Sequence, residues 1–185
     1  MRKDIYLLSF LLLFVFADAK AQYVTGAAPL QDGTVNAGEY YGGSSGPWSM
    51  CWDDNFLYLA LTGGQSNEPG IVYFDFNANT AANGGVAVGA NGSVVGKNDY
   101  GSTPNLPFVS NTRIFFATNL NGSQGLYAEL TNNTGTGWGP PTTIISVLGT
   151  SSGTVRELKL SWAQLRNGTA TRPPAFNWLD RKSVV

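Results

Sequence analysis

Three oxygen-bearing side chains alternate at the end of a predicted strand, where they could bind a hard cation. Asp75, Asn77 and Asn79 occupy every second position, and carboxylate and amide oxygens at this spacing begin many calcium-binding loops. An EF-hand loop would also need Gly at position 80 and Glu at position 86, where the chain has Thr80 and Val86. The residues therefore offer a structural calcium site outside the EF-hand class, and the alternative is an Asx-rich turn without metal.

Aromatic side chains on loops are the second group that could do chemistry, because their rings stack on the apolar faces of sugars. Trp48 follows a Gly-Pro pair and Trp138 is flanked by glycines, so both are predicted on loops that face a ligand. Tyr100 is a third candidate for carbohydrate binding by the same argument. Trp52 and Trp162 lie instead within alternating patterns and are predicted to pack in the core.

Catalytic chemistry is restricted because the chain contains no histidine. Ser/His/Asp and Cys/His triads, the usual zinc sites and histidine general bases are all excluded. Paired carboxylates could still hydrolyse a glycosidic bond. Most Asp and Glu residues lie in predicted turns, however, and their spacing selects no pair. The sequence thus predicts a protein that is not an enzyme and requires no cofactor.

The charge balance limits the classes of partner. The 11 Lys and Arg residues are matched by 12 Asp and Glu, which gives a formal net charge of −1 at pH 7. Nucleic acids and anionic lipid surfaces attract a basic patch, which this chain lacks. Cys51 is the only cysteine, so an intrachain disulfide is excluded. Its position inside a strand pattern predicts a buried thiol.

The elements that must position these residues are short strands separated by Gly-, Asn- and Pro-rich turns. This spacing predicts an all-β fold, an antiparallel β-sandwich of the jelly-roll or immunoglobulin-like type. In the strand predicted at residues 155–162, Leu158, Leu160 and Trp162 share the core face, while Glu157 and Lys159 face solvent. The strands are predicted at residues 50–53, 56–62, 71–76, 113–118, 126–131, 142–148 and 155–162. A long crossover with one weak hairpin is predicted over 77–106, and a helical turn over 163–166.

The first 21 residues have the three parts of an export signal: basic Arg2 and Lys3, an apolar stretch, and small residues before a cleavage site after Ala21. A membrane anchor is the alternative, but the apolar stretch is shorter than the roughly 20 residues that span a bilayer. No later segment is apolar enough to cross one, so membrane insertion of the mature chain is not expected. A secreted or cell-surface protein is predicted, with one sandwich domain over residues 22–179.

The C-terminal residues, 180–185, differ from the rest of the chain because three of them are charged. They can be back-translated into a sequence that resembles a common sequencing adapter. This indicates a non-native tail and a natural protein that continues beyond Leu179, whereas the alternative is an ordinary charged terminus.

Four short motifs occur in an order that resembles the family 9 carbohydrate-binding-module-like domains, which are related to the DOMON superfamily. They are the entry with LQDG and GEY, then WDDNFLYLAL, IVYFDFNAN and RELKLSWAQL. The family's last motif has Ile-Pro-Trp, and here Ser161 stands at the proline position. The resemblance implies a β-sandwich of secreted bacterial proteins that binds sugars and sometimes holds structural calcium.

Two functions are expected from these features. The first is a non-catalytic module that recognises a glycan or cell-surface polymer at or outside the cell surface. The second is a structural or adhesive spacer domain of a large sorted surface protein, without a small-molecule ligand. Neighbouring domains would separate the two functions, since a hydrolase favours sugar binding and tandem copies favour a spacer.

Overall fold

The computed structural model describes most of the chain beyond the predicted export signal, which lies outside the described residues. The described residues are 22–23, 27–40, 44–45, 47–63, 69–76, 92–98, 101–118, 126–143, 148–152 and 154–182. Across these ranges, the helical structure includes no segment with the length and apolar character needed to traverse a bilayer.

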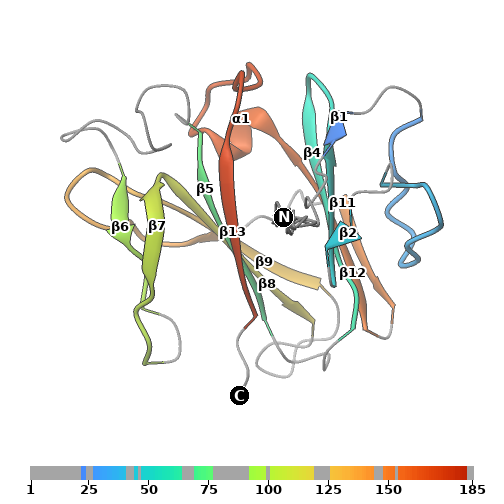
Figure 1. The fold of residues 1–185 in the computed structure, drawn as a ribbon, viewed down its shortest axis with the longest axis horizontal. Coiled ribbons are helices and arrows are strands. Elements are labelled where there is room, and N and C mark those ends of the chain that lie inside the picture. The colour runs from blue at the N-terminus through green and yellow to red at the C-terminus, as the bar shows by residue number, and fades with distance from the viewer. Residues whose placement is uncertain are drawn as a thin grey trace, which may run out of the picture.

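The described strands form two principal sheets that pack face to face as a β-sandwich (Figure 1). Sheet A has the strand order β1-β3-β4-β12-β11, with β2 beside β3. Its strands are β1 (Gln22–Tyr23), β2 (Ser44–Ser45), β3 (Trp48–Trp52), β4 (Phe56–Leu61), β11 (Leu148–Ser152) and β12 (Val155–Ser161). The pairing of β1 with β3 is parallel, and the other described pairings in this sheet are antiparallel.

Sheet B has the strand order β10-β9-β8-β5-β13, and its described pairings are antiparallel. Its strands are β5 (Gly70–Asp75), β8 (Thr112–Thr118), β9 (Leu126–Asn132), β10 (Thr142–Thr143) and β13 (Asn177–Lys182). A separate two-stranded sheet consists of β6 (Ser93–Val95) and β7 (Asn105–Ser110). The helix α1 (Trp162–Leu165) follows β12 directly. The predicted all-β sandwich is therefore confirmed.

The main core lies between the sheets, where alternate residues of facing strands meet. Leu57, Leu59 and Leu61 of β4 are each 0% exposed in this cluster. The Trp48 ring meets the Phe116 ring edge to face, with centroids 5.6 Å apart. At Gly70 the layers leave no space for a side chain, because a Cβ atom there would lie 2.8 Å from Leu61 Cδ2.

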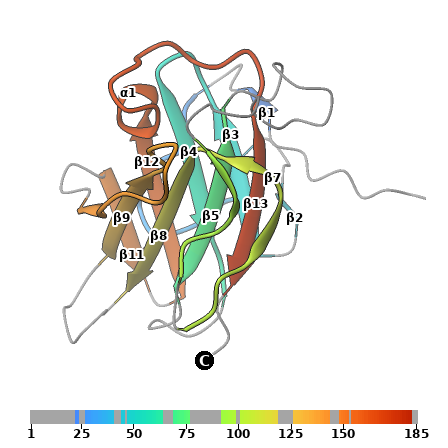
Figure 2. The ribbon, with the colours of Figure 1, turned by 90° about the vertical axis from the view of Figure 1, so that its left-hand side faces the viewer.

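The outer face of sheet B is also covered, because β7 lies across it (Figure 2). Leu106 and Phe108 of β7 pack in one cluster with Ile71, Tyr73 and Phe115 of sheet B. Burial on both faces explains why β5 is continuously apolar up to Phe74, before Asp75, instead of alternating.

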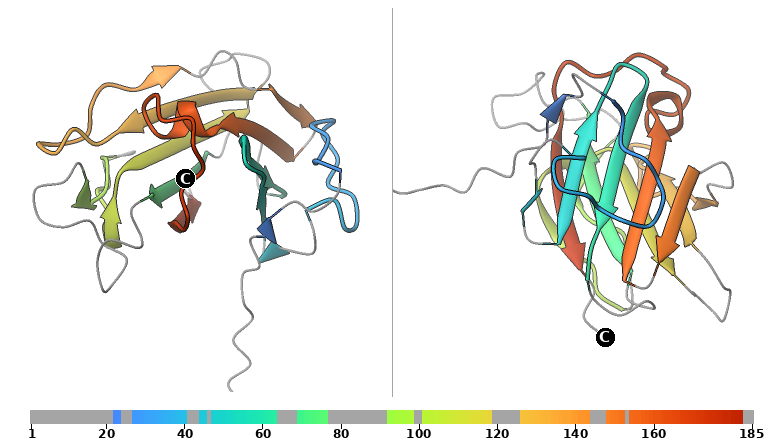
Figure 3. Two further views of the ribbon diagram at one scale, coloured as in Figure 1. Left: turned by 90° about the horizontal axis from the view of Figure 1, so that it is seen from above. Right: turned by 90° about the vertical axis from the view of Figure 1, so that its right-hand side faces the viewer.

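The outer face of sheet A is covered by residues 27–40, the blue segment in the right panel of Figure 3. Tyr40 packs there with Cys51 and Tyr58. The Glu157 side chain is 0% exposed under this segment, so the expectation that it faces solvent is wrong. Glu157 Oε2 accepts a hydrogen bond from Gly33 N at 2.7 Å, and Oε1 accepts one from the Tyr40 hydroxyl at 3.0 Å. Burial raises the pKa of this carboxyl group above its ordinary value.

The seven predicted strands agree with the described ones to within a few residues, except over 142–148. The strands β1, β2 and β13 are not among these seven, and β13 includes residues 180–182 of the segment predicted as a non-native tail. The segment predicted as one strand over 142–148 contains β10 at its beginning and the first residue of β11 at its end. The strand β7 lies at the end of the region predicted as a long crossover. The loop position expected for Trp48 is wrong, because β3 begins at Trp48 and its side chain is 2% exposed.

Candidate functional site

The end of the sandwich that carries α1 contains two hollows, and the chain segment 166–176 borders both. This segment leaves α1, crosses the end of the sandwich and enters β13, as Figure 2 shows in red. The ends of β5 and β9 and the start of β8 lie beside it, because each contributes lining residues. We call the two hollows the polar hollow and the aromatic hollow.

The helix α1 is fixed to the sandwich at both of its ends. Ser161 forms a capping box with Gln164, in which Gln164 N donates to Ser161 Oγ at 3.2 Å and Ser161 N donates to Gln164 Oε1 at 2.8 Å. The buried Trp162 donates from Nε1 to the Asp53 carbonyl at 2.9 Å. Asn167 then adopts a φ of 49°, a left-handed conformation that Asn tolerates, and the helix ends.

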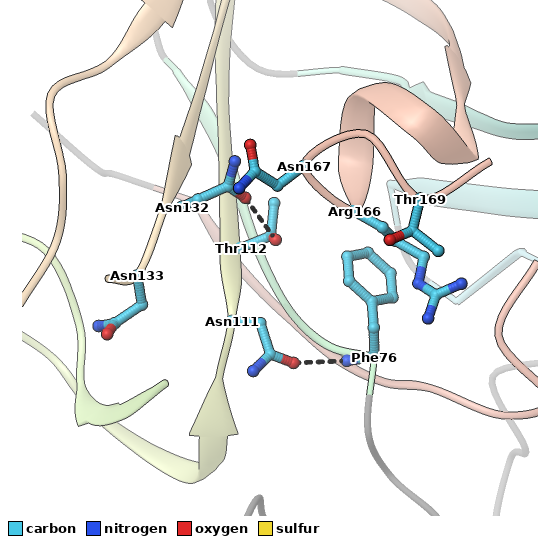
Figure 4. A pocket seen from close by; sticks show the side chains of 8 residues that line it. All are labelled: Phe76, Asn111, Thr112, Asn132, Asn133, Arg166, Asn167 and Thr169. Carbon is cyan, nitrogen blue, oxygen red and sulfur yellow. Dashed lines mark hydrogen bonds between the residues drawn. The ribbon is translucent and has the colours of Figure 1, made fainter. Parts of the chain in front are cut away.

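The polar hollow has a volume of about 290 Å³ and is open to solvent. Figure 4 shows the side chains that line it. This volume is at the lower end of the range for small-molecule sites, roughly 300 Å³ and above. Its lining is dominated by amide and hydroxyl side chains. The lining residues are Phe76, Asn111, Thr112, Asn132, Asn133, Arg166, Asn167 and Thr169.

Backbone contacts fix the orientation of two amides in this lining. The backbone N–H of Phe76 donates to Asn111 Oδ1 at 2.8 Å, as Figure 4 shows. The backbone N–H of Gly135 donates to Asn133 Oδ1, also at 2.8 Å. Because a backbone N–H can only donate, the bonded atom of each amide is its oxygen. The amide nitrogens are therefore directed away from these bonds as donors.

Asn133 Nδ2 is a buried donor without a hydrogen-bond partner. The Asn133 side chain is 5% exposed, so this nitrogen has little access to bulk water. A buried donor that finds no acceptor costs about 1–3 kcal/mol. Figure 4 shows this amide directed away from the other lining side chains, so the nitrogen does not face the polar hollow.

Arg166 is the only charged residue among the described residues that line the polar hollow. Its Nη1 donates to the carbonyl oxygen of Thr171, and it lies 3.3 Å from Thr171 Oγ1. Within the described part of the chain, no carboxylate forms an ion pair with Arg166. The hollow therefore has a positive charge that the described residues do not compensate.

The aromatic hollow has a volume of about 250 Å³ and a more apolar lining. Trp52 ends β3 of sheet A, Trp178 lies in β13 of sheet B, and Phe176 precedes β13. All three side chains are partly exposed and rest against the main core. The complete lining is Trp52, Arg172, Pro173, Pro174, Ala175, Phe176 and Trp178.

A charged pair lies beside the aromatic rings of this hollow. Arg172 Nε is 3.2 Å from Asp54 Oδ1, and the two side chains are 32% and 69% exposed. Exposed pairs of this kind contribute about 0–1 kcal/mol to stability. The contact connects the segment 166–176 to the β3–β4 turn and places a guanidinium group at the hollow.

The two hollows adjoin through a pair of phenylalanine rings. Phe76 lines the polar hollow and Phe176 lines the aromatic hollow. Their ring centroids are 6.2 Å apart at an interplanar angle of 60°. Phe176 also contacts Trp52, with centroids 5.0 Å apart. A ligand made of two or more linked rings could therefore extend across both hollows.

The structure does not bring together the aromatic residues that were predicted from the sequence to bind carbohydrate. Trp48 is buried in the core, where a surface ligand does not reach it. Trp138 packs against Tyr73, with ring centroids 5.7 Å apart, and its Nε1 donates to the Val95 carbonyl at 2.8 Å. Trp138 lines neither hollow. Tyr100 lies outside the described residues.

The predicted calcium ligands are only partly described. The Asp75 side chain is 0% exposed, and its Oδ2 accepts a hydrogen bond from Asn177 Nδ2 at 3.2 Å. Asn77 and Asn79 lie outside the described residues. Among the residues that are described, no group of three or more His, Cys, Asp or Glu side chains is placed to hold a metal ion.

Sequence reasoning missed Trp52 and Trp178 as site residues, because alternation places a residue on a face and not at an end of the sandwich. In the sequence, an acidic turn follows Trp52 and a Pro-Pro pair precedes Trp178, and these two features could have indicated the site. Comparisons with family models, with curated proteins and with solved structures find no match to this chain.

Proposed function

We propose that this protein is a non-catalytic carbohydrate-binding module that holds a sugar ring in the aromatic hollow. The observation that supports this most is the exposure of three aromatic side chains, Trp52, Phe176 and Trp178, around one hollow. Aromatic rings bind the apolar faces of sugars, and polar groups at the rim bind their hydroxyls. Arg172 is such a polar group.

Binding is proposed instead of catalysis because of the residues around each hollow. Hydrolysis of a glycosidic bond generally uses two carboxyl groups that flank the bond. The described residues that line the two hollows include no Asp or Glu. The resemblance to family 9 carbohydrate-binding-module-like domains and the predicted export signal support the same function, at or outside the cell surface.

The test measures the binding of neutral oligosaccharides to the full chain. A glycan array selects among gluco-, xylo-, manno- and galacto-oligosaccharides, and calorimetry then gives the Kd of the best one. Replacing Trp52 or Trp178 with Ala should weaken binding about tenfold or more, since loss of a stacked ring removes roughly 1.4 kcal/mol. Trp138→Ala is the matched control, because this indole lines neither hollow.

Two results would contradict the proposal. One is a chain that binds no oligosaccharide on the array. The other is binding that both Trp52→Ala and Trp178→Ala leave unchanged, especially if Trp138→Ala abolishes it.

A structural spacer is the second candidate function, and the same rings favour it. Partly exposed Trp52 and Trp178 form an apolar surface that a neighbouring module could cover. In that case the two Trp→Ala variants would weaken association between adjacent modules and leave glycan arrays blank. Analytical ultracentrifugation of the chain with its neighbouring domain distinguishes the two functions.

A further inference from the structure

The polar hollow differs from the aromatic hollow in the chemistry that it can recognise. The aromatic hollow offers ring faces, and its cation Arg172 already pairs with Asp54 at 3.2 Å. The polar hollow has Arg166 without a carboxylate partner in the described chain. Both belong to one end of the sandwich, so one ligand can meet two different environments.

Donors in the polar hollow need acceptors from a ligand. Arg166 carries five N–H donors and no acceptor. Ligands rich in acceptor oxygens therefore suit this hollow better than ligands that mainly donate.

Charge selects further among acceptor-rich ligands. A guanidinium group forms its strongest hydrogen bonds with carboxylate, phosphate or sulfate oxygens, because both charge and geometry match. The lining residues that the structure describes include no carboxylate that would repel such a group. An anionic ligand would thus meet a favourable potential at Arg166.

The two hollows are close enough for adjacent sugar units. The Phe76 and Phe176 rings that separate them have centroids 6.2 Å apart. The segment 166–176 contributes Arg166 to one hollow and Phe176 to the other. An oligosaccharide that stacks one ring on Trp52 or Trp178 can therefore extend over Phe176 toward Arg166.

We propose that the natural ligand is an acidic oligosaccharide, whose anionic unit occupies the polar hollow while a neighbouring unit stacks in the aromatic hollow. Arg166 binds the carboxylate or sulfate group. This inference rests on the proposed function, because it assumes that the aromatic hollow binds a sugar ring.

The test compares oligosaccharides that share one neutral backbone. Calorimetry with the full chain measures the Kd of a neutral tetrasaccharide, of its uronic-acid-substituted form and of its sulfated form. At least one acidic form should bind about tenfold more tightly, which equals about 1.4 kcal/mol. The advantage should decrease when the salt concentration rises from 0.05 to about 0.5 M, because salt screens charge.

Arg166→Gln should weaken the binding of the acidic form by a larger factor than that of the neutral form, and so remove the advantage of the acidic form. Lys159→Gln is the matched control, because it removes one positive charge from a side chain that lies over the Phe56 ring, outside both hollows. Circular dichroism of each variant confirms that the sandwich remains folded.

The outcomes separate this inference from the proposed function. If neutral oligosaccharides bind in a Trp52-dependent way but neither acidic form binds more tightly, the anionic subsite is refuted and the sugar-binding function stands. The subsite is also refuted if Arg166→Gln and Lys159→Gln reduce acidic binding equally. If no form binds, both proposals fail. An advantage of the uronate alone identifies the group as a carboxylate, and an advantage of the sulfated form alone identifies it as a sulfate.

Discussion

The Tyr40 hydroxyl donates a hydrogen bond to Glu157 Oε1 at 3.0 Å, although the two residues are 117 positions apart. With the Gly33 N–H contact to Oε2, this bond holds the segment 27–40 on the outer face of sheet A. The N-terminal segment is therefore attached to a buried carboxyl group as well as to an apolar surface, so its attachment should depend on pH.

Stability should decrease as the pH rises through the titration of Glu157. Burial raises the folded-state pKa of this group above its ordinary value of about 4.3, so the folded chain binds the proton more tightly than the unfolded chain does. This contribution is complete below the ordinary pKa and is lost as the pH rises through the folded-state pKa. Thermal melts between pH 4 and 8 should show the Tm of the wild type falling relative to that of Glu157→Gln.

Tyr40→Phe provides a second test, because the tyrosine hydroxyl lowers the pKa of Glu157 through its hydrogen bond. Without it, the decrease in Tm should begin at the same pH and extend to a higher one. A wild-type Tm that rises relative to that of Glu157→Gln as the pH increases would contradict the argument.

Trp48 and Trp52 should respond differently to the same substitution. Trp48→Ala removes a 2% exposed ring from the main core and should cost about 3–5 kcal/mol of unfolding free energy. Trp52→Ala removes a partly exposed ring and should cost less than half as much. Urea titrations followed by circular dichroism measure both values. Equal costs would mean that Trp52 is as buried as Trp48.

Gly70→Ala should destabilise the sandwich by about 1–3 kcal/mol, because the new methyl group overpacks the space between the sheets. The added Cβ would lie 2.8 Å from Leu61 Cδ2 and 2.9 Å from Phe116 Cζ. Leu61→Ala removes one of these contacts, so the double variant should lose less stability than the sum of the single variants. Strictly additive losses in urea titrations would disprove the steric explanation.

Cys51 should be unreactive in the folded chain. Burial raises the pKa of its thiol to about 12, with a smaller contribution from the charge of Asp53. A thiol reagent at pH 8 should therefore label the native protein slowly and the protein in urea at once. Because Cys51 is the only cysteine, the labelled fraction reports it alone. Rapid labelling without denaturant would show that the segment 27–40 leaves sheet A exposed.

Local patterns predicted the strands that alternate or that are continuously apolar, since both follow from the faces that a strand buries. The strand β7 was missed because Pro107 and polar neighbours in NLPFVS are typical of a loop. Pro occurs in strands at sheet edges, and β7 pairs with β6 on one side in the described sheet. Only the tertiary structure reveals that this strand covers sheet B.

The candidate site was harder to predict than the fold, because it depends on which side chains meet at one end of the sandwich. Trp48 follows Gly and Pro, which favours a loop, yet pairing with Leu61 places it in β3. Trp52 has the pattern of a core residue, but it lies at the end of its strand, where the layers open. Glu157 has the pattern of a solvent-facing residue, and a segment more than 100 positions away covers it.

The chain between α1 and β13 is bounded by a capped helix on one side and by a strand paired with β5 on the other. Phe176, the last residue of the connection, packs against Trp162 of α1, whereas the capping box and the strand pairing use no residue from 167–175. Exchange of residues 167–175 for sequences from a randomised library should therefore change the lining of both hollows without refolding the sandwich. The same framework could be given new selectivity as a laboratory reagent, in the way that antibody loops are diversified.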